Sequence, residues 1–343
     1  MRMNKELLQR ILSMIRRFIP QWRLYGFYIA IWSLLFPLHH LFVPFRPFFG
    51  IRKHKLILKY LSDLYGGVID AFTNRDTAPQ SFIEPDSTIW VCWWDGEDAI
   101  PPLVRVCYDS ILRRAGKHPV KLISKYNYRD FVSIPEYIIE KVNAKIMTVT
   151  HFSNMLRANL LYEYGGIWMD ITILALKDIS LDNIRFFTLK APARNASISL
   201  ARYAGLSNSS MPFQGKTNPN ISRWSGFLLA GTKHSPIFEY MRDILYAYWK
   251  DHDDQIDYVL YDYTIALGYD NIPVMRELID SVPCSEVEKF ELEKNLNAEF
   301  SDEKFAYFSR TTFHKLTWKK GFNAYTKGDK LTIYGHLLEG KLP

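Results

Sequence analysis

Residues 151–174, which read HFSNMLRANLLYEYGGIWMDITIL, decide the fold. Up to Tyr164 the apolar side chains recur at helical spacing, which predicts a helix with one buried stripe. The stripe consists of Phe152, Met155, Leu156, Leu160 and Tyr164. Gly165 and Gly166 then predict the end of the helix, because glycine accepts the left-handed backbone that helix ends commonly need.

After the two glycines the pattern changes to period two, which predicts a strand over residues 167–174. The aliphatic side chains share one strand face, whereas Trp168, Asp170 and Thr172 share the other. Asp170 is therefore an acid in an otherwise apolar strand. A buried charge is costly unless it binds a partner, and a divalent cation is the obvious candidate. The alternative is that Asp170 only caps or pairs within the fold.

The polar face of the preceding helix carries further candidates. Ser153, Asn154 and Arg157 lie opposite the apolar stripe and place two neutral polar groups beside one guanidinium. A guanidinium can form paired hydrogen bonds with phosphate or ribose oxygens. Arg157 is therefore expected to bind such oxygens or to pair with Asp170, and the alternative is a salt bridge within its own helix.

The flanking sequence alternates strand and helix patterns. Strands are predicted over residues 88–94, 120–123, 185–190 and 224–230, and helices over 53–70, 101–112, 135–142, 236–249, 255–267 and 286–299. This order is typical of an α/β fold with a mostly parallel sheet that binds ligands at the carboxyl ends of its strands. Asp95 and Asp170 both lie at such ends. Residues 193–220, rich in Ser, Asn, Gly and Pro, predict a mobile loop over the site.

Composition bounds the class of protein. A chain of 343 residues that is 48% hydrophobic and 15% aromatic is not disordered, and it is long enough for one large α/β core. The three cysteines, Cys92, Cys107 and Cys284, have no paired spacing. The sequence therefore argues against a disulfide framework or a zinc site and fits a reducing compartment.

Positive charge is concentrated near the amino terminus. Residues 1–62 contain 11 Lys and Arg against a single acid, Glu6, which gives +10, while the rest of the chain carries −3. Because the excess lies in an apolar segment, it indicates an anionic membrane surface rather than a nucleic acid as partner. We expect residues 1–75 to be a helical membrane-associating segment and residues 76–343 to be a separate domain, with a linker near residues 72–86.

An apolar run within that segment is long enough to span a bilayer. Residues 24–45 contain no charge in 22 positions, but Pro37 and Pro44 interrupt them and both flanks are basic. We therefore expect an anchor that lies in the membrane plane or re-enters it. The alternatives are a single span, a signal peptide, and a hydrophobic helix packed on the soluble domain.

The order of polar residues resembles a known sugar-transferase pattern. Ser153-Asn154-x-x-Arg157, then Tyr164-Gly165-Gly166-x-x-x-Asp170-x-Thr172, is similar to Ser-Asp-x-x-Arg … Tyr-Gly-Gly-x-x-x-Asp-x-Asp. On these residues the chain resembles the capsular polysaccharide synthesis proteins, a group related to glycosyltransferase family 32, from about residue 89 to residue 319. It departs at Asn154 and Thr172, where the pattern usually has Asp, and fewer carboxylates mean weaker metal binding.

This resemblance implies a fold and an activity. The fold is a GT-A-like nucleotide-diphospho-sugar transferase fold, with a mostly parallel mixed sheet flanked by helices. The activity is metal-assisted transfer of a hexose from a nucleoside-diphosphate sugar, UDP-linked and with retention, to a surface polysaccharide or lipid-linked glycan acceptor. The enzyme is expected in the cytoplasm, attached peripherally or monotopically to the inner membrane, where nucleotide sugars are made.

The resemblance also implies roles for single residues. Donor nucleotide-sugar contacts are expected from Trp93, Trp94, Asp95, Ser153, Asn154, Arg157, Gly165, Gly166 and Lys315. Mn²⁺ or Mg²⁺ is expected on Asp170, Thr172 and His314, and the catalytic set on Asp170, Arg157 and Asp257.

Each role has a structural alternative. Adjacent tryptophans are often core residues, and Asp257 would be an acid on a helix surface, sharing a face with Tyr261. The whole protein also has an alternative function, which is that of a non-catalytic sugar-binding or assembly subunit of a polysaccharide-synthesis complex. The presence of Asp170, Arg157 and His314 favours an active enzyme over a non-catalytic subunit.

Overall fold

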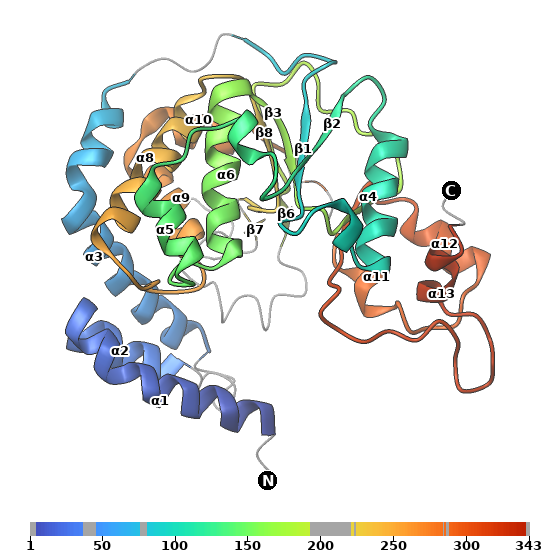
Figure 1. Cartoon of the computed structure of the whole chain (residues 1–343), viewed down its shortest axis with the longest axis horizontal. Helices are drawn as coiled ribbons and strands as arrows, with labels where there is room; N and C mark the ends of the chain where they lie inside the picture. Colours follow the sequence, from blue (N-terminus) through green and yellow to red (C-terminus); the bar gives the residue numbers. More distant parts are fainter. Residues whose placement is uncertain are drawn as a thin grey trace.

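The structure is a computed structural model that describes residues 5–36, 46–75, 81–192, 221–222, 224–283, 285 and 288–340. A β-sheet with helices on both faces forms the centre of the molecule (Figure 1). The loop predicted over residues 193–220 lies outside the described residues.

The central sheet has five strands in the order β2-β1-β3-β8-β5. They are β1 Ile89–Cys92, β2 Val120–Ile123, β3 Gly166–Met169, β5 Phe186–Thr188 and β8 Leu228–Gly231. β1 pairs in parallel with β2 and β3, whereas β8 runs antiparallel to β3 and β5. The sheet is thus mixed, and the predicted parallel arrangement holds for its first three strands. Parallel neighbours need a long crossover, usually a helix, and the described residues between β3 and β8 contain none.

The predicted strand over residues 167–174 is wrong in one respect, because it is two strands. β3 ends at Met169 and β4 (Ile173–Ala175) begins after a turn in which the Ile173 amide donates to the Asp170 carbonyl at 2.9 Å. β3 pairs within the central sheet, but β4 pairs with β9 (Phe313–Lys315). Two different partners separate the two halves, which leaves Asp170 and Thr172 in the connection. A third small sheet joins β6 (Ala191–Pro192) to β7 (Ile221–Ser222).

Helix α6 (Val149–Tyr164) begins at Thr148, whose side chain accepts from the His151 amide at 3.3 Å. It ends as predicted at the glycine pair, where Gly165 and Gly166 have φ of +68° and +93°. The expected single buried stripe is wrong, because α6 is buried on nearly every side between the sheet and α8, whereas Tyr164 is 47% exposed. This burial explains why Asn154 and Arg157 are interior residues.

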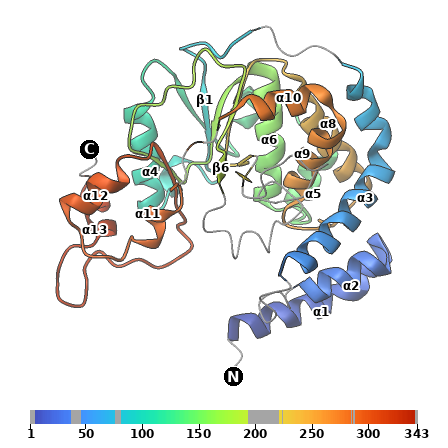
Figure 2. The ribbon, with the colours of Figure 1, turned by 180° about the vertical axis from the view of Figure 1, so that it is seen from behind.

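Two layers of helices cover the sheet (Figures 1 and 2). On one face, α3, α6, α8 and α9 pack on side chains such as Trp90 and Trp168, and α5 and α10 complete this layer. On the other face α4 packs on Ile167 and Met169, with the carboxyl-terminal helices α11, α12 and α13 behind it. These helices are α3 Arg46–Thr73, α4 Pro102–Arg114, α5 Glu136–Asn143, α8 Pro236–Asp251, α9 Leu260–Asn271, α10 Pro273–Ser281, α11 Glu291–Lys294, α12 Asp302–Phe308 and α13 Ile333–Leu338, with short 3-10 turns η3 Glu97–Ala99 and η4 Tyr128–Asp130.

Two predicted helices are shorter than expected. The helix predicted over residues 255–267 begins only at Leu260, so Asp257 and Tyr261 do not share a helix face. The helix predicted over 286–299 is reduced to the single turn of α11.

The amino-terminal segment forms α1 (Lys5–Tyr25) and α2 (Phe27–Leu35), joined at Gly26 with φ +89°. Within the described part of the chain, every helix is too short or too polar to cross a bilayer. Arg17 pairs with Asp254 at 3.2 Å, and the Tyr25 hydroxyl donates to the Asp254 carbonyl at 2.8 Å. α3 contributes Ile57, Leu61 and Ile69 to the same core as α6, α8 and α9, so residues 46–75 share the packing of the rest of the chain. The domain boundary expected at residue 75 stays a prediction.

The glycine pair provides a test of this packing. A Cβ added to Gly166 would lie 2.3 Å from the Thr88 carbonyl oxygen, and its φ of +93° is unfavourable for any other residue. We expect Gly166→Ala to lower the free energy of unfolding by about 3 kcal/mol. Gly67→Ala is the matched control, because Gly67 lies in α3 with open space around it and alanine favours helix by about 0.5–1 kcal/mol. Urea denaturation checks both, and equal stability of the two variants would contradict this account of the turn.

Candidate functional site

Three charged side chains from three elements meet at the carboxyl end of β3. Asp170 follows β3, Arg157 comes from α6 and Lys315 from β9. One carboxylate oxygen of Asp170, Oδ1, accepts from Arg157 Nη2 at 3.2 Å and from Trp168 Nε1 at 3.1 Å. The other, Oδ2, accepts from Lys315 Nζ at 2.9 Å. We call Arg157, Asp170 and Lys315 the ion cluster.

Packing and backbone pairing position each member of the ion cluster. The Arg157 guanidinium lies over the rings of Trp168 and Tyr261, at 4.9 and 4.8 Å from their centroids, and its side chain is 6% exposed. Lys315 pairs with Ile173 in the β4–β9 ladder. The Asp170 side chain is 30% exposed, so a ligand can reach the cluster from solvent.

The electrostatics of Asp170 reflect two opposing effects. Burial by itself raises the pKa of the carboxyl group, but the charges of Lys315 and Arg157 outweigh burial and hold the pKa below its ordinary value. Asp170 is therefore ionised at neutral pH. With two cations on one carboxylate, the ion cluster carries a net positive charge and suits an anionic ligand.

Thr172 lies beside the ion cluster, as expected from the sequence. The Lys315 ammonium donates to the Thr172 hydroxyl as well as to Asp170. The Lys315 backbone is fixed at the same point, because the Leu316 amide donates to the Thr172 carbonyl at 3.0 Å.

His314 lies away from this group. It is the neighbour of Lys315 on β9, so strand alternation turns it to the opposite face, where it is fully buried and its Nε2 donates to the Phe308 carbonyl at 2.9 Å. Burial lowers the pKa of its ring. The structure therefore does not bring His314 to Asp170.

The residues present do not fit a resident divalent cation. Mg²⁺ and Mn²⁺ prefer several oxygen ligands, carboxylates above all. Here one carboxylate already has cations on both oxygens, and the described residues contain no group of three or more His, Cys, Asp or Glu side chains arranged for a metal. The Mn²⁺ or Mg²⁺ expected on Asp170, Thr172 and His314 stays a prediction.

The two tryptophans of the predicted base site differ. Trp94 is packed against Phe152 and Tyr128, at 4.9 and 5.5 Å between ring centroids, which favours the core alternative. Trp93 donates from Nε1 to the Ala99 carbonyl at 3.0 Å and meets the Trp318 ring edge-on at 5.6 Å. Trp318 was not predicted from the sequence, because no local pattern relates it to residue 93.

Asp95 lies at an open depression near the end of β1. Its carboxylate pairs with Lys125 at 2.9 Å and is 65% exposed. It lines a cavity of about 570 Å³ together with Gly96, Ser124 and Asn127. β1 and β3 are parallel neighbours, so Asp95 and Asp170 both follow strand ends at the same edge of the sheet, as predicted.

The remaining helix and turn residues are divided between the two ends of α6. Asn154 is buried, and the Ser153 hydroxyl donates to the Thr150 carbonyl at 2.8 Å. Gly165 precedes β3 and Gly166 is its first residue, whereas Asp170 follows the strand, so β3 separates Gly166 from Asp170 by roughly 13 Å. The two glycines therefore close the helix and are not brought to the candidate donor site.

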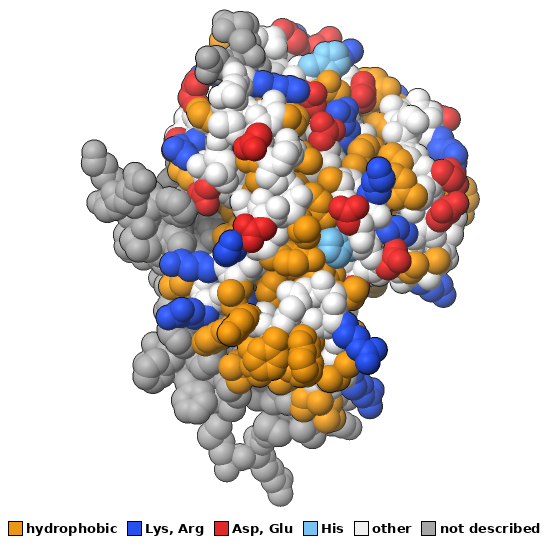
Figure 3. Space-filling model, turned by 90° about the vertical axis from the view of Figure 1, so that its left-hand side faces the viewer, with side chains coloured by type: hydrophobic (Ala, Val, Ile, Leu, Met, Phe, Trp, Pro, Cys, Tyr) orange, Lys and Arg blue, Asp and Glu red, His pale blue; other side chains and the backbone are white. Residues whose placement is uncertain are grey.

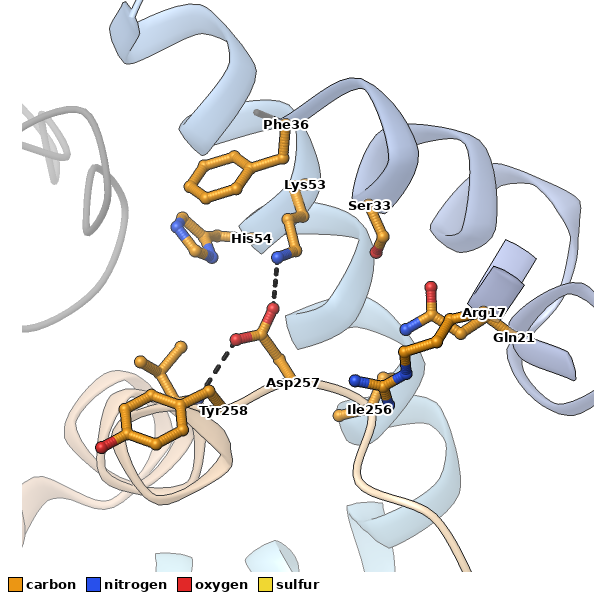
Figure 4. Close-up of a pocket in the computed structure, with 10 residues that line it drawn as sticks. Arg17, Gln21, Ser33, Phe36, Lys53, His54, Ile256, Asp257 and Tyr258 are labelled. Carbon is orange, nitrogen blue, oxygen red and sulfur yellow. Dashed lines mark hydrogen bonds and ion pairs between the residues drawn. The ribbon is translucent and has the colours of Figure 1, made fainter. Parts of the chain in front are cut away.

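Asp257 is not part of the ion cluster and lines a separate pocket, where it faces Lys53 (Figure 4). It precedes α9, is partly buried, and pairs with Lys53 of α3, while its Oδ1 accepts from the Val259 amide at 3.1 Å. Burial opposes ionisation, but Lys53 holds the pKa of Asp257 below its ordinary value. With Ser33 and His54 it lines a cavity of about 190 Å³ between the amino-terminal helices and the loop before α9.

This position excludes a helix-surface acid, and the Asp257 carboxylate contacts Lys53 and the Val259 amide, both of which belong to the fold. Tyr261, four residues further on, is the residue of this segment that meets Arg157.

The fold and the site together define an α/β protein with a mixed sheet and an ion-paired carboxylate at the carboxyl end of a parallel strand. The family model described as "Capsular polysaccharide synthesis protein" matches residues 44–337. The chain belongs to this family, and the resemblance drawn from residues 153–172 is confirmed.

Two further comparisons add little. No curated protein matches the chain. A solved structure titled "PaToxG Glycosyltransferase" is 16% identical, covers 66% of this chain and 83% of that chain, and has a TM-score of 0.36. At this TM-score no residue role is carried over from it.

The ion cluster predicts a defined pH dependence of stability. Because the folded pKa of Asp170 lies below the ordinary value of 3.8, its contribution is complete above that value and is lost as pH falls through the folded pKa. Asp170→Asn leaves two cations uncompensated and should cost about 2–4 kcal/mol near neutral pH. Thermal unfolding followed from about pH 7 to about pH 2 should show a constant difference from wild type down to about pH 4 and a shrinking difference below it.

The matched control is Asp178→Asn, which removes an exposed carboxylate paired with Arg114. It should change stability by less than about 1 kcal/mol at any pH. An Asp170→Asn deficit that stays constant as the pH falls would show that the carboxylate charge is not its cause.

Proposed function

We propose that the protein is a glycosyltransferase of capsular polysaccharide synthesis whose donor diphosphate binds at the ion cluster. The single observation that carries the proposal is the partly exposed Asp170 carboxylate held between Arg157 and Lys315 at the carboxyl end of a parallel strand. Membership of the family supports the substrate class. Such strand ends are where open α/β sheets bind their ligands.

The chemistry follows from charge. When the glycosidic C–O bond breaks, the bonding electron pair stays with the departing diphosphate, and negative charge develops on its oxygen. Arg157 and Lys315 are preorganised cations that stabilise such charge without having to reorient. Asp170 contributes by orienting both cations, since each donates to one of its oxygens.

The donor and acceptor are assigned by chemical class. We propose a UDP-linked hexose as donor, with the uracil near Trp93, Trp318 and Asp95, and a surface polysaccharide or lipid-linked glycan as acceptor. In the proposed retaining reaction, the leaving phosphate takes the proton of the attacking acceptor hydroxyl. Asp257 has no place in this scheme because its carboxylate pairs with Lys53.

The second candidate is a non-catalytic sugar-binding or assembly subunit. It is favoured by Asn154 and Thr172, which stand where the sugar-transferase pattern has carboxylates. Hydrolysis of nucleotide sugars distinguishes the two, because only a transferase breaks the glycosidic bond.

We predict that the full-length protein hydrolyses or transfers from one nucleotide sugar in a screened set, with and without added Mn²⁺. Asp170→Asn should reduce that rate by about 10³-fold, because Arg157 and Lys315 lose the group that orients them. Asp178→Asn should retain the wild-type rate. Product formation is measured by chromatography of the released nucleotide, and an active Asp170→Asn variant would remove the ion cluster from the mechanism.

The amino-terminal helices carry an apolar surface. On the face shown in Figure 3, hydrophobic side chains gather over the part formed by α1 and α2, with Lys and Arg at its sides. The exposed side chains that form this apolar surface are Leu12, Ile15, Ile19, Trp22, Leu24, Phe27 and Tyr28. Arg16 and Arg23 are exposed beside them.

We propose that this apolar surface lies on the anionic cytoplasmic face of the inner membrane. Apolar side chains enter the interface, and each nearby basic residue adds about 1 kcal/mol of attraction to anionic lipid. α2 has nine residues and the 21-residue α1 carries basic side chains along its length, and both features fit an in-plane attachment.

Vesicle binding tests the apolar surface. The double variant Ile15→Glu with Ile19→Glu should lower partitioning of the full-length protein onto phosphatidylglycerol-containing vesicles by at least about tenfold. It removes apolar area that would enter the membrane and adds two negative charges. Leu112→Glu is the control, because Leu112 is equally exposed but lies on α4. Co-sedimentation measures both, and equal binding by all three proteins would rule out this surface.

A further inference from the structure

We propose that the Lys315 ammonium takes the place of a divalent metal in the donor site, so that donor binding and sugar transfer need no metal ion. The inference rests on the proposed function and assigns the cation of that same site. It starts from the fact that the ammonium contacts both side chains that stand at the Asp-x-Asp positions of the sugar-transferase pattern, Asp170 and Thr172.

The Lys315 ammonium lies where the sugar-transferase pattern would place a metal ion. In the pattern, two carboxylates at these positions would face a cation. Here Lys315 Nζ lies 2.9 Å from Asp170 Oδ2 and also donates to the Thr172 hydroxyl. The Lys315 side chain is 21% exposed, which leaves one side of the ammonium open to a ligand. An ammonium has three donors, so it can bind a phosphate oxygen while keeping both contacts.

Backbone hydrogen bonds and a ring contact hold Lys315 in place. Its amide donates to the Lys289 carbonyl at 2.7 Å. Lys315 is the last residue of β9 and pairs with Ile173 of β4, and directly after it the Leu316 amide donates to the Thr172 carbonyl at 3.0 Å. Its ammonium lies 5.4 Å from the centroid of the Phe227 ring. Lys315 is therefore a positioned side chain, and bringing it out of the site would leave Asp170 with an unsatisfied oxygen.

The charge of the site also favours an ammonium over a divalent ion. The second carboxylate of the pattern is replaced by the neutral Thr172, which reduces the negative charge by one, and a singly charged ammonium matches what remains better than a divalent ion does. Arg157 occupies the other oxygen of Asp170. A metal ion approaching Asp170 would meet two fixed positive charges, whereas a diphosphate would be attracted by both.

The test measures binding of nucleoside diphosphates to the full-length protein by isothermal titration calorimetry. UDP, GDP, ADP and CDP are titrated in EDTA and again in Mn²⁺. We expect one of them to bind in EDTA with an affinity that Mn²⁺ changes by no more than about twofold. Lys315→Met, which replaces the four-carbon stem by a chain of similar shape and removes the ammonium, should weaken that binding at least about tenfold.

Two further variants complete the design. Lys315→Arg should restore most of the affinity in EDTA, because it keeps the charge on β9. Lys330→Met is the control, since Lys330 pairs with the distant Glu299 and should bind like the wild type.

Nucleotide binding that requires Mn²⁺, or an unchanged affinity in Lys315→Met, would overturn the role of Lys315 while leaving the glycosyltransferase proposal intact. Failure of every nucleotide under both conditions would overturn the donor site itself and the inference with it.

Discussion

The charge of Asp170 is the constraint on which the site depends. A carboxylate at the edge of an apolar sheet is tolerated only when its oxygens are satisfied, and here Arg157, Trp168 and Lys315 satisfy them from three elements. The same contacts tie α6, β3 and β9 together, although β9 lies about 145 residues beyond β3 in the chain. The contacts that stabilise this part of the fold are therefore made by the same atoms that we propose for ligand binding.

Two largely buried ion pairs lie in different parts of the molecule. Arg157–Asp170 lies at the strand end, and Lys53–Asp257 joins α3 to the loop before α9. In both, the paired cation holds the carboxylate ionised against the effect of burial. Only the first combines a partly exposed carboxylate with a second cation, Lys315. This difference is why we propose anion binding at the strand end and a purely structural role for Lys53–Asp257.

The sequence predicted the parts of the fold that local patterns determine. The period of the apolar residues located α6, and the glycine pair located its end, because both depend on neighbours within a few residues. Asp170 and Asp95 were placed correctly at one sheet edge, since parallel strands align their carboxyl ends.

What the sequence could not supply came from pairing between distant segments. The break between β3 and β4 depends on β9, and the burial of Asp257 depends on Lys53 of α3, more than 200 residues earlier. The direction in which His314 points depends on strand alternation relative to Lys315. The motif alone does not contain this information, so the sequence predicted both residues of the pair as ligands.

The packing of α3 has a consequence for geometry at a membrane. This helix has 28 residues, or about 42 Å of length if it were straight, and its side chains join the core that also contains α6, α8 and α9. With α1 and α2 on a bilayer, the height of Asp170 above the lipid is set by packed helices and not by a flexible tether. An acceptor anchored in the same bilayer would then react only if its hydroxyl lay at one fixed height above the lipid.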